Sequence, residues 1–335
     1  MELQRIAYSR KSGWSDDDLP RLDSPQTLVV VFGSSCYLDG PDAVSELAAA
    51  YPRSTVVGCS TAGEIVGDTI ADESLSVAVM QFDHTTLRST SAPVTSPQES
   101  FQAGERIARE LAGDGLAGIL VLSDGLNVNG SELVRGLNSA LPEDVVVTGG
   151  LAGDGDRFQR TWVLDDGRPV TGLVTAVGLY GERIRIGHGS MGGWDLFGPE
   201  RTVTRAEGNV LYELDGEPAL ALYKKYLGDR AAELPASALL FPLSLRAAEG
   251  EDKAVVRTIL SVSEDEQSLT FAGDLPEGGR VQLMRANFDR LIEGAAEAAL
   301  HTKRTNGLNG ANGHAQNGDA SHLSIAISCV GRRLV

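Results

Sequence analysis

One stretch of the chain occurs twice, and this repeat limits the available folds more than any single motif does. Residues 28–64 align without a gap on residues 118–154, so that Gly40 falls on Gly130. Two copies are too few for a solenoid, in which several repeats stack. We therefore expect a duplicated unit whose halves pack around a pseudo-two-fold axis, with a natural place for a ligand in the cleft between them.

Each copy has the pattern of a strand, a helix and a second strand. In the first copy, residues 29–32 form a short apolar run rich in β-branched side chains, which is typical of a buried strand. Apolar residues then recur at helical spacing between Pro41 and Pro52, and residues 55–57 form the next strand. A unit of this length predicts a right-handed parallel crossover.

The similarity resumes after an insertion, where residues 77–82 match residues 175–180. Each segment is followed by an alternating run, at 86–90 and at 183–187, so we expect an antiparallel hairpin in each copy. The predicted fold class is therefore α/β with mixed α+β character. It consists of an internally duplicated β-α-β-plus-hairpin unit that forms mixed sheets flanked by helices.

The remaining segments are assigned from periodicity and composition. We expect, in chain order, a linking helix at 97–112, a Gly-rich aromatic loop at 189–199, helices around 210–214 and 218–227, a strand at 281–284, a helix at 288–299, a flexible loop at 303–321 and a strand at 324–328. We divide the chain into an N-terminal extension (1–24), a region with the two copies (25–190, copies at 28–92 and 118–190) and a C-terminal region (191–335).

The composition restricts the compartment and the partners. The chain has 46 acidic and 29 basic residues, a net charge of −17, and no basic run, so it would repel a nucleic acid or an anionic membrane. Its three cysteines form no CxxC pair and are odd in number, which favours a reducing compartment. No segment approaches the roughly 20 apolar residues of a membrane span. We expect a soluble cytoplasmic protein with no nucleic-acid or membrane partner.

Five strings of the sequence occur in an order that resembles one known family. They are VGCSTAGEI at 57–65, GGLAGD at 149–154, VTRAEGN at 203–209, ELDGEPA at 213–219 and SCVGR at 328–332. In this order they resemble the N- and C-terminal segments of the FIST family, the F-box and intracellular signal transduction domain. The resemblance covers roughly residues 25–335.

The resemblance implies a sensory, ligand-binding module that acts beside signalling proteins. It also implies an alternative, because some bacterial members are haem proteins that sense nitric oxide and control a histidine kinase. In the family, the strand with Cys-x-x-Arg, here Cys329 and Arg332, is followed by a Gly-Glu turn and final strands. The chain ends at Val335, so we expect a late strand and part of the site to be missing.

Our first candidate for a ligand site is the pair of polar turns that close the two copies. The residues expected to contact a ligand there are Cys59, Ser60, Thr61 and Glu64 in the first copy and Gly149, Gly150 and Asp154 in the second. Glycines let backbone N–H groups approach a ligand closely, and such turns form nests for anions or polar groups. The alternative is that these glycines are present only because tight turns need positive φ angles.

Further candidate ligand contacts lie outside the two turns. Asp124 and Asn127 follow a strand end, where they are either turn and cap residues or polar ligand contacts. Trp194 and Arg205 either stack on and pair with a planar or acidic ligand, or fill the core and form a surface salt bridge. Arg332 completes the set of expected ligand contacts.

These features leave three classes of function. We predict first a sensor that binds a small polar, amino-acid-like metabolite between the copies and signals through a partner such as a histidine kinase. The alternative is a haem-based nitric oxide sensor with His188 as iron ligand, although no CxxCH is present. The second alternative is a hydrolase with Cys59 or Ser60 as nucleophile, but the sequence has no Gly-x-Ser-x-Gly elbow and no histidine near either turn. We therefore predict no catalytic activity, no metal site and no cofactor outside the haem alternative.

Overall fold

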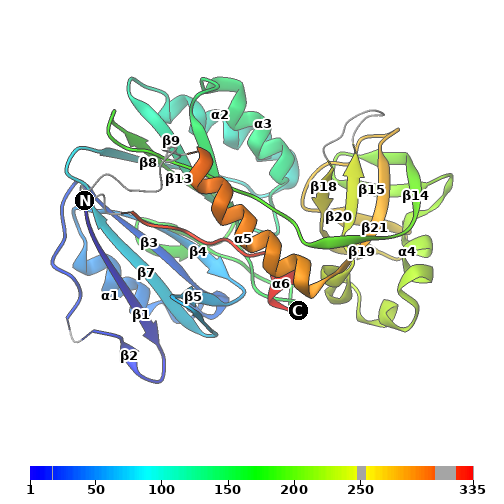
Figure 1. The fold of residues 1–335 in the computed structure, drawn as a ribbon, viewed down its shortest axis with the longest axis horizontal. Helices are drawn as coiled ribbons and strands as arrows, with labels where there is room; N and C mark the ends of the chain where they lie inside the picture. The colour runs from blue at the N-terminus through cyan, green and yellow to red at the C-terminus, as the bar shows by residue number, and fades with distance from the viewer. Residues whose placement is uncertain (17, 247–253, 306–321, 335) are drawn as a thin grey trace.

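The computed structural model of the protein describes residues 1–16, 18–246, 254–305 and 322–334. Figure 1 shows two sheets and their helices on the left, a further sheet on the right, and α5 running across the front. The fold class predicted from the sequence, mixed sheets flanked by helices, is confirmed. The predicted loop at 303–321 lies outside the described residues, apart from residues 303–305, which end α5.

The first sheet has seven strands, with β3 and β4 parallel and β3 and β7 antiparallel. Their order is β12 (Arg168–Val170), β11 (Val163–Asp165), β4 (Thr55–Thr61), β3 (Thr27–Ser34), β7 (Ser74–Gln81), β1 (Glu2–Ser9) and β2 (Gly13–Trp14). Around it lie η1 (Ser35–Leu38), α1 (Asp42–Ala50) and the small hairpin of β5 (Glu64–Val66) and β6 (Thr69–Ala71). The residues assigned to an N-terminal extension thus supply two strands of this sheet.

The second sheet has four strands and carries two helices on its outer face. Its order is β10 (Val146–Leu151), β9 (Leu116–Ser123), β13 (Leu173–Tyr180) and β8 (Thr86–Pro93). The helical segments are η2 (Pro97–Glu99), α2 (Ser100–Leu111) and α3 (Gly130–Ala140). The linking helix expected at 97–112 is therefore confirmed.

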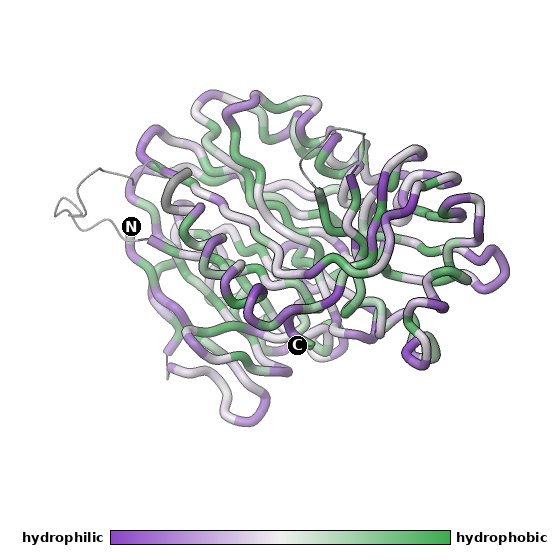
Figure 2. The backbone as a smooth tube through the Cα atoms, turned by 45° about the vertical axis from the view of Figure 1, so that its right-hand side comes forward, coloured by the Kyte–Doolittle hydropathy of each residue, from purple (hydrophilic) through white to green (hydrophobic). Residues whose placement is uncertain are grey.

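The N-terminal part has four layers, in the order helix, sheet, sheet, helix. Alternate residues of β3 face opposite sides, so that Val29 and Val31 pack in the core under α1. Leu28 and Val30 pack against the second sheet, in a core that includes Leu120. A strand buried on both faces needs apolar residues at every position, which explains why the apolar residues of β3 follow one another without interruption. The hydropathy colouring of Figure 2 shows these strands as hydrophobic stretches inside the layers.

The two sheets share one strand order. The order β4-β3-β7-β1 in the first corresponds to β10-β9-β13-β8 in the second, with the same parallel and antiparallel pairs. A glycine faces β3 or β9 at the same point of each sheet. A Cβ on Gly58 would lie 2.3 Å from the carbonyl oxygen of Val31, and one on Gly149 would lie 1.8 Å from that of Val121. The descent of both units from one duplicated ancestor stays a prediction.

The predicted hairpins are wrong. After β7 the chain leaves the first sheet, and β8 pairs with β13 in the second, from Thr86↔Tyr180 to Pro93↔Leu173. β1 occupies the corresponding position in the first sheet. The run at 183–187 forms no strand. A period of two shows that a segment lies in a sheet, but it does not show which strand is its neighbour.

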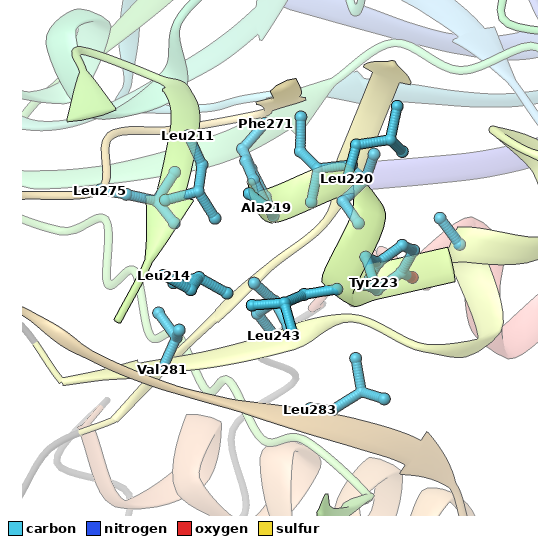
Figure 3. Packing of buried hydrophobic residues seen from close by; sticks show 14 of the residues in the cluster. Leu211, Leu214, Ala219, Leu220, Tyr223, Leu243, Phe271, Leu275, Val281 and Leu283 are labelled. Carbon is cyan, nitrogen blue, oxygen red and sulfur yellow. The ribbon is translucent and has the colours of Figure 1, made fainter. Parts of the chain in front are cut away.

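The C-terminal part is a curled sheet of eight strands around its own core. The strands are β18 (Val255–Arg257), β17 (Leu243–Arg246), β21 (Arg280–Ala286), β14 (Trp194–Glu207), β15 (Val210–Leu214), β20 (Ser268–Phe271) and β19 (Ile259–Ser263) in spatial order, with β16 (Glu217–Pro218) beside β15. Figure 3 shows Leu211, Leu220 and Phe271 packed between the sheet and α4 (Ala219–Leu227). The short helical turns η3 (Gly228–Glu233) and η4 (Ala236–Leu240) follow α4.

Several predictions for the C-terminal part are confirmed and others are wrong. α4, β21 and α5 (Phe288–Thr305) confirm the helix at 218–227, the strand at 281–284 and the helix at 288–299. The helix expected around 210–214 is the strand β15, because a run of five residues has no period that separates helix from strand. Residues 194–199 belong to β14 rather than to a loop.

The strand expected at 324–328 is also wrong. Residues 322–329 have no strand partner among the described residues and lead to the short helix α6 (Val330–Arg333). An extended apolar segment becomes a strand only where a neighbour offers free backbone groups. No helix within the described residues is both long and apolar enough to cross a bilayer.

Candidate functional site

An open cleft of about 860 Å³ lies between the N-terminal and C-terminal parts. One wall is a side of α3, and the other comes from β18 and the segment after β20, an arrangement that can be followed in Figure 1. The lining residues are Gly130, Ser131, Val134, Arg135, Asn138 and Ser139 on one side and Val256, Arg257, Thr258, Ala272 and Gly273 on the other. This volume lies in the range typical of small-molecule sites.

Asn129 positions the helical wall of the cleft. Its Oδ1 accepts hydrogen bonds from the backbone N–H groups of Ser131 (3.1 Å) and Glu132 (3.4 Å), which makes it the N-cap of α3. Its Nδ2 donates to Oδ1 of Asp274 in the C-terminal part at 2.5 Å. One asparagine therefore starts the helix and also ties it to the opposite wall.

Two further hydrogen bonds, both donated by backbone N–H groups, join the two parts of the molecule at the same point. The N–H of Gly130 donates to the carbonyl oxygen of Ala272 at 3.0 Å, and the N–H of Asp274 donates to Ser131 Oγ at 3.2 Å. A Cβ on Gly273 would lie 2.6 Å from that hydroxyl, so any other residue there would require the Ser131 side chain to move. A ligand in the cleft would thus lie beside the contact that joins the two parts.

Two carboxylates from opposite parts meet beside this contact. Glu132 forms an ion pair with Arg135 on α3, with 2.5 Å between Oε2 and Nη2. Burial and the neighbouring carboxylate of Asp274 raise the pKa of Glu132, while Arg135 opposes this shift. The proton affinity of Glu132 therefore depends on how firmly Arg135 is held.

Arg257 is the half-buried cation of the cleft wall. Its Nε donates to the carbonyl oxygen of Asp274 at 2.9 Å, and its Nη2 donates to Ser131 Oγ at 3.3 Å. Burial lowers the pKa of its guanidinium, which still stays charged because arginine is not deprotonated in proteins. Within the described residues, no carboxylate lies at ion-pair distance from it.

The two segments predicted as closing turns do come together, but away from this cleft. The N–H of Gly153 donates to the carbonyl oxygen of Ser60 at 2.9 Å. The assignment of Cys59, Ser60 and Thr61 to a turn is wrong, because they end β4, and Gly149 and Gly150 likewise lie in β10. None of the residues predicted to contact a ligand is among those that line the cleft.

Both oxygens of each acidic residue in the two closing segments accept hydrogen bonds from groups of the same chain. Glu64, 1 % exposed, accepts hydrogen bonds from Thr61 Oγ1 (2.7 Å) and from the N–H (3.1 Å) and Oγ (2.6 Å) of Ser74. Burial raises the pKa of Glu64. Asp154 accepts from the three backbone N–H groups of residues 158–160, at 3.1, 2.8 and 3.1 Å. Each carboxylate holds a loop against a strand end.

The two nucleophiles of the hydrolase alternative are not arranged for attack. Cys59 is buried, and this burial raises the pKa of its thiol to about 12, so at neutral pH it is not a thiolate. Ser60 is also buried, and its Oγ accepts a hydrogen bond from the N–H of Trp162 at 3.0 Å. Both side chains serve the packing of β4.

The remaining polar candidates near the two sheets have structural partners too. Asp124 accepts from the N–H groups of Leu126 and Asn127 at 2.8 Å each and from the N–H of Gly172 at 3.0 Å. Asn127 Nδ2 also donates to Asp124, at 3.2 Å. This geometry supports the interpretation as turn residues. Gly149, with φ at +151° and a backbone oxygen within 1.8 Å of an ideal Cβ, supports the structural interpretation of the glycines.

The candidates in the C-terminal part are dispersed. Arg205 pairs with Glu213 at 2.9 Å and lies over the ring of Tyr212, which matches the surface salt bridge named as its alternative role. Arg332 donates to the carbonyl oxygen of Met191 at 3.0 Å. Trp194 begins β14 and packs against Gly331, whose Cβ would lie 2.9 Å from the indole. Their ligand contacts stay predictions.

His188 lies in an exposed position on the segment before β14 and does not line the cleft. It is the residue that the haem alternative would use as an iron ligand. Haem binding therefore stays a prediction that rests on the resemblance and not on this cleft. Among the described residues, no group of three or more His, Cys, Asp or Glu side chains is placed to hold a metal ion.

The comparisons with known proteins concern almost the whole chain. The family model of the FIST N domain matches residues 27–217, and that of the FIST C domain matches residues 219–335. A search of curated proteins finds no match. The boundary between the two matches falls just before α4, so the cleft is lined by residues from both matched regions.

Proposed function

The chain belongs to the FIST family, whose domains are sensory domains of signal transduction, and from this premise we propose a specific sensory role. In this proposal the protein binds a small polar molecule of amino-acid size in the cleft between α3 and β18. It then passes its bound or free state to a separate signalling protein, such as a histidine kinase. The proposed ligand site is thus the cleft and not the two closing turns predicted from the sequence.

The observation that carries this proposal is that the two cleft walls come from two different parts of the fold. α3 belongs to the outer layer of the second sheet, whereas β18 is the edge strand of the C-terminal sheet. A ligand that contacts both walls binds more tightly to the arrangement of the two parts in which it can touch α3 and β18 together. Its binding therefore shifts the population of the protein toward that arrangement. This is the property that a sensory module needs.

The contact beside the cleft supports the same role. The hydrogen bonds of Asn129, Gly130 and Ser131 to residues 272–274 join the parts at the N-terminus of α3. They are few and polar, and contacts of this kind are individually worth only about 1 kcal/mol. A ligand of ordinary affinity therefore has enough binding free energy to strengthen or break this contact.

The test is a thermal-shift screen of amino acids and other small polar metabolites on the full chain, repeated with Val134→Trp. Val134 is 49 % exposed on α3, so tryptophan fills the cleft without disturbing the core. Ile292→Trp on the exposed side of α5 is the matched control. We expect a stabilising compound whose effect is lost in Val134→Trp and kept in Ile292→Trp. A screen without such a compound contradicts the proposal.

A further inference from the structure

The charges of the cleft have one sign. Among the described residues that line it, Arg135 and Arg257 carry charge and both are cations. This contrasts with the whole chain, which has a net charge of −17. Two carboxylates, those of Glu132 and Asp274, lie beside these arginines but do not line the cleft. The charged side chains that face the open space are therefore both cations, in a chain that is acidic as a whole.

Arg257 has donors to spare in this space. A guanidinium has five N–H donors in a planar fork, and the hydrogen bonds to Asp274 and Ser131 use two of its nitrogen atoms. Both acceptors are neutral. The Asp274 carboxylate attracts this guanidinium electrostatically but does not form a direct ion pair with it. Arg257 can therefore still donate to a carboxylate in the cleft, the group whose geometry matches the fork.

Arg135 can join an anion at little cost. Its side chain is 67 % exposed, and it is held by a surface ion pair with Glu132 and by the Phe101 ring, 5.0 Å from its guanidinium carbon, contacts that are each weak at exposed sites. If Arg135 turns toward an anion in the cleft, Glu132 loses its cation while Asp274 stays close. Glu132 then takes up a proton more readily, so anion binding is linked to proton uptake at the junction.

The rest of the lining restricts the body of the ligand. Val134 on α3 and Val256 on β18 are 49 % and 40 % exposed and offer an apolar side chain from each wall. The other side chains are the neutral Ser131, Asn138, Ser139, Thr258 and Ala272. No carboxylate among the described lining residues would receive an ammonium group. A zwitterionic amino acid therefore fits less well than the same molecule without its amino group.

We propose that the cleft binds a small organic carboxylate with an uncharged, branched or aromatic body, whose carboxylate pairs with Arg257 while its body lies between Val134 and Val256. This inference rests on the proposed function, since it assigns a ligand class to the same cleft. In this inference Arg135 is a second contact: it leaves its ion pair with Glu132 and pairs with the carboxylate of the ligand.

The experiment compares the affinity of isovalerate with that of three other probes. Binding to the full chain is measured by isothermal titration calorimetry with probes at millimolar concentration. The probes are isovalerate, its neutral amide isovaleramide, its amino derivative L-valine, and inorganic phosphate as an anion without a body. We expect isovalerate to bind most tightly. Arg257→Gln should weaken its binding at least tenfold, and Val134→Trp should abolish it.

The matched control is Arg280→Gln, because Arg280 also donates to a neutral hydroxyl, that of Thr202 at 3.0 Å, but lies outside the cleft. This variant should bind isovalerate like the unchanged chain. A second signature is proton uptake, seen as a dependence of the measured heat on the ionisation enthalpy of the buffer and absent in Glu132→Gln.

The outcomes separate the ligand class from the sensory proposal. Tighter binding of isovaleramide or L-valine, sensitive to Val134→Trp, overturns the carboxylate assignment and leaves the cleft as a binding site. Phosphate binding as tightly as isovalerate overturns the apolar body. Isovalerate binding that is indifferent to Arg257→Gln, or no binding of any probe, also overturns the inference. The metabolite screen then decides the sensory proposal by itself.

Discussion

Two sets of charged side chains in this protein have opposite surroundings. Glu64 and Asp154 lie where the segments after β4 and β10 meet, are almost fully buried, and have their oxygens occupied by groups of the same chain. Arg135 and Arg257 line an open cleft, and no carboxylate of the described residues lies at ion-pair distance from Arg257. Hydrogen-bond partners within the chain, rather than charge or position at a strand end, therefore separate a structural group from a binding group.

The first prediction tests whether the carboxylates are structural. Asp154→Ala leaves the backbone N–H groups of residues 158–160 without their acceptor, and each lost partner costs on the order of 1 kcal/mol. We expect the free energy of unfolding to fall by about 3 kcal/mol in urea titrations. Asp156→Ala is the control, since Asp156 is exposed and its loss should cost less than about 0.5 kcal/mol. Equal losses in the two variants would contradict the comparison.

Much of the four-layer part could be predicted from the sequence. The apolar run at 29–32 and the helical spacing between Pro41 and Pro52 have a strong local pattern, because burial on both faces of a strand or on one stripe of a helix dictates the residue types. The pairing of β8 with β13 and the place of β1 could not be predicted. Strand partners are chosen by tertiary packing, which leaves no periodic trace in either strand alone.

The cleft could not be predicted for a related reason. Its walls, α3 and β18, are separated by more than a hundred residues, and Arg257 lies in a three-residue strand with no motif around it. The two turns were predicted to bind a ligand because glycines and acidic residues after strands are common in ligand sites. The same residue types serve equally well to let strands approach and to hold loops, as Gly149 and Asp154 do here. Only the occupancy of their hydrogen-bonding groups decides between the two roles.

The second prediction concerns how the stability of the protein depends on the protonation of Glu64. Burial raises the pKa of Glu64 above its ordinary value of 4.5, so the folded state holds this proton more tightly than the unfolded state. The resulting stabilisation is fully present below the ordinary pKa and is lost as the pH rises through the folded pKa. We expect Glu64→Gln, which stays neutral and can still accept from Ser74 and donate to Thr61, to remove this loss.

The measurement for Glu64 is the difference in the free energy of unfolding between the variant and the unchanged chain, followed from pH 4 to about pH 8. This difference should grow in favour of Glu64→Gln as the pH rises. Glu46→Gln on the exposed side of α1 is the control and should give a flat difference. A flat difference for Glu64→Gln too would mean that the hydrogen bonds offset burial completely.

The third prediction has the smallest expected effect on stability and tests the other half of the comparison. Arg257→Gln removes two hydrogen bonds to neutral acceptors and the attraction of Asp274, but it also removes a partly desolvated cation that has no direct ion pair. These contributions oppose each other, so we expect the free energy of unfolding without ligand to change by less than about 1 kcal/mol. Arg280→Gln, measured in the same urea titrations, sets the size of an ordinary surface change. A fall in the free energy of unfolding as large as that of Asp154→Ala would mean that Arg257 holds the two parts together. Arg257 would then be a structural group like Glu64 and Asp154, which would contradict its assignment as a binding group.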